Sequence, residues 1–99
     1  LDNYLHVIIN NGAHDSVGGQ PTVGKTVDFL AVAKGLGYKT VKRVESLHEI
    51  SSFVSESHEG PVCVEIRVKK GNRSDLGRPK TTPVENKEAF MHYVSKEGR

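Results

Sequence analysis

The chain has 99 residues, of which 35% are hydrophobic and 26% charged, and its formal net charge is +2. A chain of this length makes one small domain, and so mild a charge gives no reason to expect nucleic acid or a membrane as a partner. No apolar run approaches the roughly 20 residues of a membrane helix, and a single cysteine, Cys63, excludes an internal disulfide and favours a reducing, cytoplasmic location.

The first half of the chain predicts a strand, a loop, a helix and a second strand. Residues Tyr4–Ile9 form a hydrophobic, largely β-branched run, which is typical of a central strand covered on both faces. A glycine-rich polar loop follows over residues 12–24. Apolar side chains at helical spacing predict a helix over residues 26–36, and partial alternation predicts a strand over Tyr38–Val44.

A second helix is predicted from a capping box at Ser46–Glu49, in which the serine and the glutamate satisfy main-chain N–H groups reciprocally. This helix is expected to end near Ser57. Its apolar stripe is expected to consist of Leu47, Ile50, Phe53 and Val54.

The end of the chain predicts a strand, a basic loop and a last helix. Val62–Val68 is the third strand, and Lys69–Lys80 is a basic loop that contains glycine. A second capping box, Thr82–Glu85, carries proline at the first helical position, where its missing N–H costs nothing. The side chains expected to dock this helix are Val84, Phe90, Met91 and Val94.

The order of these elements predicts an α/β fold, with a parallel sheet between helices on both faces in three layers. Three strands make a thin sheet, and the chain begins at Leu1 without a methionine. We therefore expect a piece of a longer protein, whose upstream elements complete the sheet.

Gly19–Thr26 matches the P-loop pattern G-x-x-x-x-G-K-[ST], which predicts nucleotide binding. A working P-loop leaves a strand directly, but the first strand ends near Asn10, nine residues before Gly19. It also needs an aspartate that ends an apolar strand, whereas the comparable strand carries Glu65 in its middle. The alternative is that the glycines provide turns and that Lys25 and Thr26 open a helix.

Asn10-Asn11-Gly12 stands at the carboxyl end of a predicted parallel strand, where open α/β sheets bind their ligands. An asparagine oxygen and a main-chain oxygen two residues later can supply two neighbouring positions around Mg²⁺, and Gly12 permits the turn. The same three residues are also an ideal turn sequence without any metal.

A longer stretch, Val7–Thr22, resembles the second half of the thiamine diphosphate motif in 2-oxo acid decarboxylases. The run Ala13–Gln20 is fairly specific, and Lys70–Pro79 and Thr82–Glu88 are also similar to that family, so the likeness spans nearly the whole chain. It implies that residues 1–99 are the C-terminal part of a single thiamine diphosphate-binding domain. The family motif opens with Gly-Asp-Gly, which this chain does not contain.

The resemblance implies a role for each residue of the turn. The side chain of Asn11 and the main-chain oxygen of Ala13 would bind Mg²⁺, which holds the diphosphate of the cofactor. The residues implied in cofactor binding are Asn11, Gly12, Ala13 and Ser16. His14 and Asp15 are candidate catalytic residues on a proton route, and Gln20 is a candidate substrate contact.

The implied reaction is decarboxylation of phosphonopyruvate to phosphonoacetaldehyde and CO₂ in phosphonate biosynthesis, with sulfopyruvate or another 2-oxo acid as the alternative substrate. The family forms its sites between subunits of a homo-oligomer, so the 99 residues alone are expected to be inactive. Basic residues of the loop invite a phosphonate-binding interpretation, although such a run is more often a solvated surface: Lys69, Lys70, Arg73 and Arg78. A non-catalytic α/β interaction domain would have the same fold.

Overall fold

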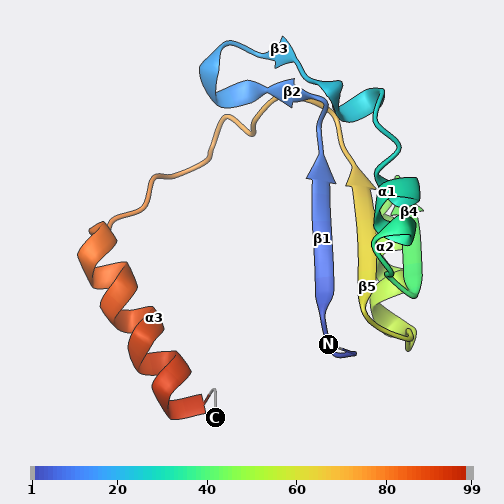
Figure 1. The fold of residues 1–99 in the computed structure, drawn as a ribbon. Helices are drawn as coiled ribbons and strands as arrows, with labels where there is room; N and C mark the ends of the chain where they lie inside the picture. The colour runs from blue at the N-terminus through green and yellow to red at the C-terminus, as the bar shows by residue number, and fades with distance from the viewer. Residues whose placement is uncertain (1, 98–99) are drawn as a thin grey trace.

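The computed structural model describes residues 2–97 and contains a three-stranded parallel sheet (Figure 1). The strands are β1 (Leu5–Asn10), β4 (Thr40–Val44) and β5 (Val62–Arg67), in the spatial order β1-β5-β4. The two crossovers contain the helices α1 (Phe29–Gly35) and α2 (Leu47–Ser55). The α/β class predicted from the order of elements is therefore confirmed.

The sheet is covered on both faces of β5. Val62 and Val64 belong to the core on one face, together with Phe53 of α2. Cys63 and Glu65 point to the other face and are just as fully buried, because α1 packs across β4 and β5 there. The core under α2 consists of Val44, Phe53, Val62 and Val64, with Ile50 and Ile66 packed against it.

Within residues 2–97, the first strand is not the central strand of the sheet. β1 pairs only with β5 and forms an edge of the sheet as described, and β5 is the central strand. Leu5, Val7 and Ile9 of β1 are exposed, since no described segment covers that face. The apolar run forms a strand as predicted, but no segment within residues 2–97 covers its exposed face.

Residues 12–24 are more ordered than the predicted loop. They contain a short antiparallel pair, β2 (Ala13–His14) and β3 (Gln20–Pro21). A 3₁₀ turn over Asp15–Val17 joins the two strands, and a second one follows over Val23–Lys25. This hairpin sits above the carboxyl ends of β1 and β5 (Figure 1).

The first helix begins three residues later than predicted. The side chain of Asp28 accepts a hydrogen bond of 3.1 Å from the N–H of Ala31 and so caps α1 at Phe29. Lys25 and Thr26 end a 3₁₀ turn and do not open a helix, which corrects that expectation.

The capping box of α2 is confirmed, because Ser46 Oγ accepts from the N–H of Glu49 at 3.1 Å. The carboxylate of Glu49 accepts in return from the Ser46 hydroxyl at 3.2 Å and from the main-chain N–H of Glu45 at 3.4 Å, one residue before the N–H that a capping box uses. Only part of the predicted apolar stripe is used: Phe53 is buried and Ile50 partly so, but Leu47 and Val54 are exposed.

The last helix, α3 (Pro83–Glu97), forms as predicted but does not dock. Its capping box is complete, with Thr82 and Glu85 exchanging hydrogen bonds of 3.2 and 2.7 Å. The helix stands away from the sheet at the end of a long connection (Figure 1). The four side chains predicted to dock it are all exposed: Val84, Phe90, Met91 and Val94. None of the helices in the described part of the chain is both long and apolar enough to cross a membrane.

Candidate functional site

The candidate site lies at the carboxyl edge of the sheet, as the sequence predicts for a parallel α/β fold. Asn10 at the end of β1 is in register with Arg67 at the end of β5. The β2–β3 hairpin follows β1 there, and the connection after β5 runs beside the hairpin before it leaves for α3 (Figure 1). Two segments far apart in the sequence thus meet at one edge.

Asn10 anchors this edge from inside the protein. Its side chain is buried, and its amide nitrogen donates to the main-chain oxygen of Gly24 and, at 3.2 Å, to Glu65 Oε2. Its amide oxygen accepts from the N–H of Gly12 at 3.1 Å. One buried side chain therefore fixes both the turn after β1 and the 3₁₀ turn that follows the hairpin.

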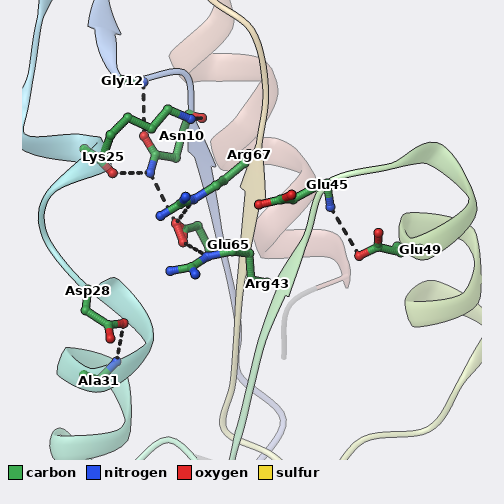
Figure 2. A network of polar contacts seen from close by, with 11 residues as sticks. Asn10, Gly12, Lys25, Asp28, Ala31, Arg43, Glu45, Glu49, Glu65 and Arg67 are labelled. Carbon is green, nitrogen blue, oxygen red and sulfur yellow. Dashed lines mark hydrogen bonds and ion pairs between the residues drawn. The ribbon is translucent and has the colours of Figure 1, made fainter.

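Glu65 is the charged centre below Asn10, with a side chain that is 0% exposed. Figure 2 shows Arg43, Arg67 and Asn10 converging on its carboxylate. Arg43 Nε donates to Oε1 at 2.8 Å and Arg67 Nε to Oε2 at 3.3 Å. Burial by itself raises the pKa of Glu65, but the hydrogen bonds from Arg43, Asn10 and Arg67 outweigh it, and the pKa lies below its ordinary value.

Sequence reasoning did not identify this network. In the sequence, Glu65 serves only as evidence against a P-loop. The signal was available, because a glutamate inside an apolar strand needs a buried partner. Arg67 follows two residues later on the same face, and Arg43 lies on the predicted neighbouring strand.

Gly24 provides a test of how tightly Asn10 is held. A Cβ at Gly24 would lie 2.5 Å from Asn10 Oδ1 and 3.0 Å from Thr22 Oγ1. We expect Gly24→Ala to destabilise the turn by about 1–3 kcal/mol, because the buried amide must move. Amide hydrogen exchange of residues 10–14 in the full-length protein measures this loss.

Gly35 offers the matched control for that substitution. It lies in α1, and an added Cβ there would meet nothing within 4 Å. Gly35→Ala is therefore expected to be neutral or to stabilise by about 0.5–1 kcal/mol. Equal exchange rates around Asn10 in the two variants would show that Gly24 is not constrained.

Asn11 points the other way and is oriented from two sides. Its amide nitrogen donates to Asp15 Oδ2 at 2.9 Å, and its Oδ1 accepts from the N–H of Ala13 at 3.1 Å. These contacts fix which end of the amide carries the oxygen, and Oδ1 keeps a second lone pair. Gly12, at φ 66°, makes the tight turn that brings Asn11 and Ala13 together.

The oxygens of this turn fit a hard cation. Ala13 faces Pro21 across the hairpin, and proline has no N–H to donate to the Ala13 carbonyl. The amide oxygen of Asn11 and the carbonyl oxygen of Ala13 are the neutral ligands that Mg²⁺ accepts beside a carboxylate. Within residues 2–97, no three His, Cys, Asp or Glu side chains gather into a metal cluster. The assignment of Asn11 and Ala13 as Mg²⁺ ligands therefore stays a prediction.

A cavity of about 710 Å³ opens beside the turn. It brings together five of the predicted site residues and leaves out two, Gly12 and Gln20. Gly12 lies next to the Lys25 side chain, and Gln20 is exposed on β3. The turn contributes Asn11, Ala13, His14, Asp15 and Ser16 to the lining, and the connection after β5 contributes Asn72, Arg73, Leu76, Gly77 and Arg78.

Asp15 joins the two walls of this cavity. Its Oδ2 accepts from the Asn11 amide and also from the N–H of Gly71, at 2.8 Å. A second link runs from Lys70 Nζ to the main-chain oxygen of Gly19, at 3.4 Å. The basic loop is thus tied to the hairpin that carries the predicted metal ligands. The catalytic roles of His14, which is exposed in the cavity wall, and of Asp15 stay predictions.

The segment Gly19–Thr26 does not have the geometry of a P-loop. It passes through β3 and a 3₁₀ turn, and the next α-helix starts only at Phe29. The ammonium group of Lys25 donates to the main-chain oxygen of Asn10 at 3.3 Å. Main-chain N–H groups at a helix N-terminus, which cradle phosphates in a P-loop, are not assembled around this lysine.

Fold and site together define an α/β domain with an ordered turn and a polar cavity at the carboxyl edge of its parallel sheet. No family model matches the chain. Its sequence is 38% identical over 95 residues to a phosphonopyruvate decarboxylase of Streptomyces viridochromogenes and 35% identical over 95 residues to one of Streptomyces hygroscopicus. Each alignment covers 94% of this chain and 24% of the relative, so the chain spans about a quarter of the curated relatives it matches. The resemblance drawn from the residues is confirmed.

Proposed function

We propose that the chain is the cofactor-binding part of a carboxy-lyase that converts phosphonopyruvate to phosphonoacetaldehyde and CO₂. The observation that supports this most is the identity of 35–38% to two phosphonopyruvate decarboxylases over 94% of the chain. The activity belongs to a longer protein, in which residues 1–99 form the C-terminal part of a thiamine diphosphate-binding domain. Phosphonate biosynthesis is the corresponding pathway, and the cytoplasm the corresponding compartment.

The turn after β1 would hold the cofactor through Mg²⁺. Asn11 Oδ1 and the carbonyl oxygen of Ala13 would bind the metal, and Ser16 in the same cavity would donate to the diphosphate. The anionic ligand would come from a Gly-Asp-Gly segment outside this chain. Bound thiamine diphosphate supplies a nucleophilic carbon and an electron sink, which is the chemistry that loss of CO₂ from a 2-oxo acid requires.

The remaining residues of the cavity would position the substrate and move a proton. His14 lines the cavity, exposed to solvent, and is our candidate to carry the proton to the product. Asp15 holds Asn11 and the loop main chain in place, so its contribution would come through their positions. Gln20 lies outside the cavity lining and would need to approach from β3 to contact the substrate.

A homo-oligomer with the site between subunits is part of the proposal. It is supported by the apolar surfaces that the described chain leaves exposed, namely Leu5, Val7 and Ile9 on β1 and the apolar residues of α3. Burial of such surface is the main favourable term in association. Light scattering on the full-length protein measures the oligomeric state.

The full-length protein is expected to release CO₂ and phosphonoacetaldehyde from phosphonopyruvate. Activity should disappear after dialysis against a chelator and return only when both Mg²⁺ and thiamine diphosphate are added, because the metal holds the cofactor. Sulfopyruvate and pyruvate, tested beside phosphonopyruvate, decide between the substrate alternatives. Full turnover without either added component, after their removal has been verified, would contradict the proposed function.

A further inference from the structure

The cavity beside Asn11 contains two arginines, and their surroundings differ. Arg73 and Arg78 both line the wall that comes from the basic loop. Asn11 and Ala13, the predicted metal ligands, line the same cavity. A guanidinium group in such a position can pair with two oxygens of a phosphoryl or phosphonate group at once.

Arg73 is already engaged within the loop. Its Nε donates to Asp75 Oδ1 at 3.0 Å and its Nη2 to Asp75 Oδ2 at 2.7 Å. The hydrogen bonding raises the pKa of Arg73 and lowers the pKa of Asp75. The fork of Arg73 is therefore occupied by a carboxylate of its own loop, which cancels its charge for a ligand.

Arg78 has no such partner. Among residues 2–97, no hydrogen bond or ion pair is formed by its side chain, although it lines the same cavity. The only carboxylate in the cavity lining is that of Asp15, which is engaged by Asn11 and by the main chain of Gly71. Arg78 is thus the uncompensated cation of this cavity.

The position of the loop is fixed relative to the metal-binding turn. Asp15 accepts from the N–H of Gly71 at 2.8 Å, and Lys70 donates to Gly19 at 3.4 Å. Both contacts hold the start of the loop against the hairpin. A small dianion bound in this cavity would have both Arg78 and Asn11 in the lining around it.

We propose that Arg78 binds the phosphonate group of the substrate and thereby selects phosphonopyruvate over 2-oxo acids that lack a second anionic group. This inference rests on the proposed function and names its specificity-determining residue. The diphosphate of the cofactor presents the same oxygen chemistry, so the experiment must separate the two sources.

The test uses the full-length protein and the variants Arg78→Gln, Arg78→Lys and Lys80→Gln. Lys80 belongs to the same loop but lies outside the cavity lining, so Lys80→Gln removes one positive charge without touching the cavity. For each protein, KM and kcat are measured with phosphonopyruvate and with pyruvate. Calorimetry gives the Kd of phosphonoacetate, an unreactive phosphonate, and the Kd of thiamine diphosphate in the presence of Mg²⁺.

Arg78→Gln is expected to raise the KM for phosphonopyruvate and the Kd of phosphonoacetate roughly tenfold, since a charge-assisted pair is lost. The KM for pyruvate and the Kd of thiamine diphosphate should stay within twofold of the unmodified protein. Arg78→Lys should recover part of the loss, because it keeps the charge but not the fork. Lys80→Gln should leave all four quantities unchanged.

Three results would overturn the assignment. They are an unchanged KM for phosphonopyruvate in folded Arg78→Gln, a matching loss of thiamine diphosphate affinity, and an equal effect of Lys80→Gln. The first result would show that Arg78 does not bind the substrate, and the second that it binds the cofactor instead. The third would show that its effect comes from net charge alone. An unmodified protein without activity on phosphonopyruvate would refute the proposed function itself, whereas each of the three results leaves that function intact.

Discussion

Replacement of Glu65 by glutamine is expected to weaken the sheet by about 3 kcal/mol, the cost of breaking a buried ion pair from one side. The carboxylate is completely buried and binds Arg43, Arg67 and Asn10 (Figure 2). Glutamine fills the same space but carries no charge, so two guanidinium groups lose their counter-ion. Hydrogen exchange of the β4 and β5 amides in the full-length protein measures the local free energy of opening.

Glu45→Gln is the matched control. Glu45 lies just beyond β4, is exposed, and loses the same charge in the substitution. Surface substitutions of this kind stay within about 0.5 kcal/mol. Similar exchange rates in Glu65→Gln and Glu45→Gln would show that the buried network does not stabilise the sheet.

The same network makes the stability of the sheet depend on pH. The pKa of folded Glu65 lies below the ordinary value of 4.5, so the unfolded chain takes up a proton first as the pH falls. The contribution of Glu65 to stability is therefore complete above that ordinary value and is lost as the pH falls through the folded pKa. In Glu65→Gln this acid-induced loss in β5 should be absent, while other carboxylates still titrate.

Local signals in the sequence predicted the elements well. Ser46–Glu49 and Thr82–Glu85 are capping boxes in the structure because each needs only the chain within one helical turn. The start of α1 shows the limit of this approach. Periodicity extended the helix back to residue 26, but the Asp28 side chain begins it at Phe29.

Neighbours in the sheet could not be predicted in the same way. The run Leu5–Ile9 is more continuously apolar than an edge strand requires, yet β1 is an edge among the described residues and β5 is central. Hydrophobicity indicates that a strand is suited to burial, but it does not identify the element that would cover it. The exposed apolar side chains of α3 make the same point for a helix.

The candidate site depends both on local signals in the sequence and on which strands are neighbours in the sheet. The turn Asn10–Ala13 is local, and the sequence predicted its position at the end of a strand. The link from Asp15 to Gly71 spans 56 residues and depends on β1 and β5 lying side by side. No spacing in the sequence indicates that link, so Arg78 could only be assigned to a wall of the cavity once the structure was known.

Asn10 and Asn11 show how adjacent identical residues acquire different roles. Successive residues of an extended chain point in opposite directions. Asn10 is 5% exposed and binds Glu65 and two glycines inside the protein, whereas Asn11 lines the cavity. The two positions should therefore respond differently to the same substitution: Asn10→Ala in stability, and Asn11→Ala in binding.

Asn11→Ala is expected to weaken Mg²⁺-dependent binding of thiamine diphosphate roughly 100-fold in the full-length protein, because loss of partners around a metal ligand alone costs 10–100-fold. The substitution removes the proposed metal-binding oxygen and the hydrogen bonds of Asn11 with Asp15 and with the N–H of Ala13. Calorimetric titration of the metal-loaded protein with thiamine diphosphate gives the Kd directly, without reliance on turnover.

Asn3→Ala serves as the control for this loss, since Asn3 is exposed before β1, at the opposite end of the strand. It should bind the cofactor like the unmodified protein. Asn10→Ala should instead open the turn and speed hydrogen exchange at Gly12 and Gly24, because its buried amide bonds both segments. Weaker cofactor binding in Asn10→Ala would follow from the opened turn, because that turn carries Asn11 and Ala13. An unchanged affinity in Asn11→Ala, beside normal binding in Asn3→Ala, would therefore be the result that contradicts Asn11 as a metal ligand.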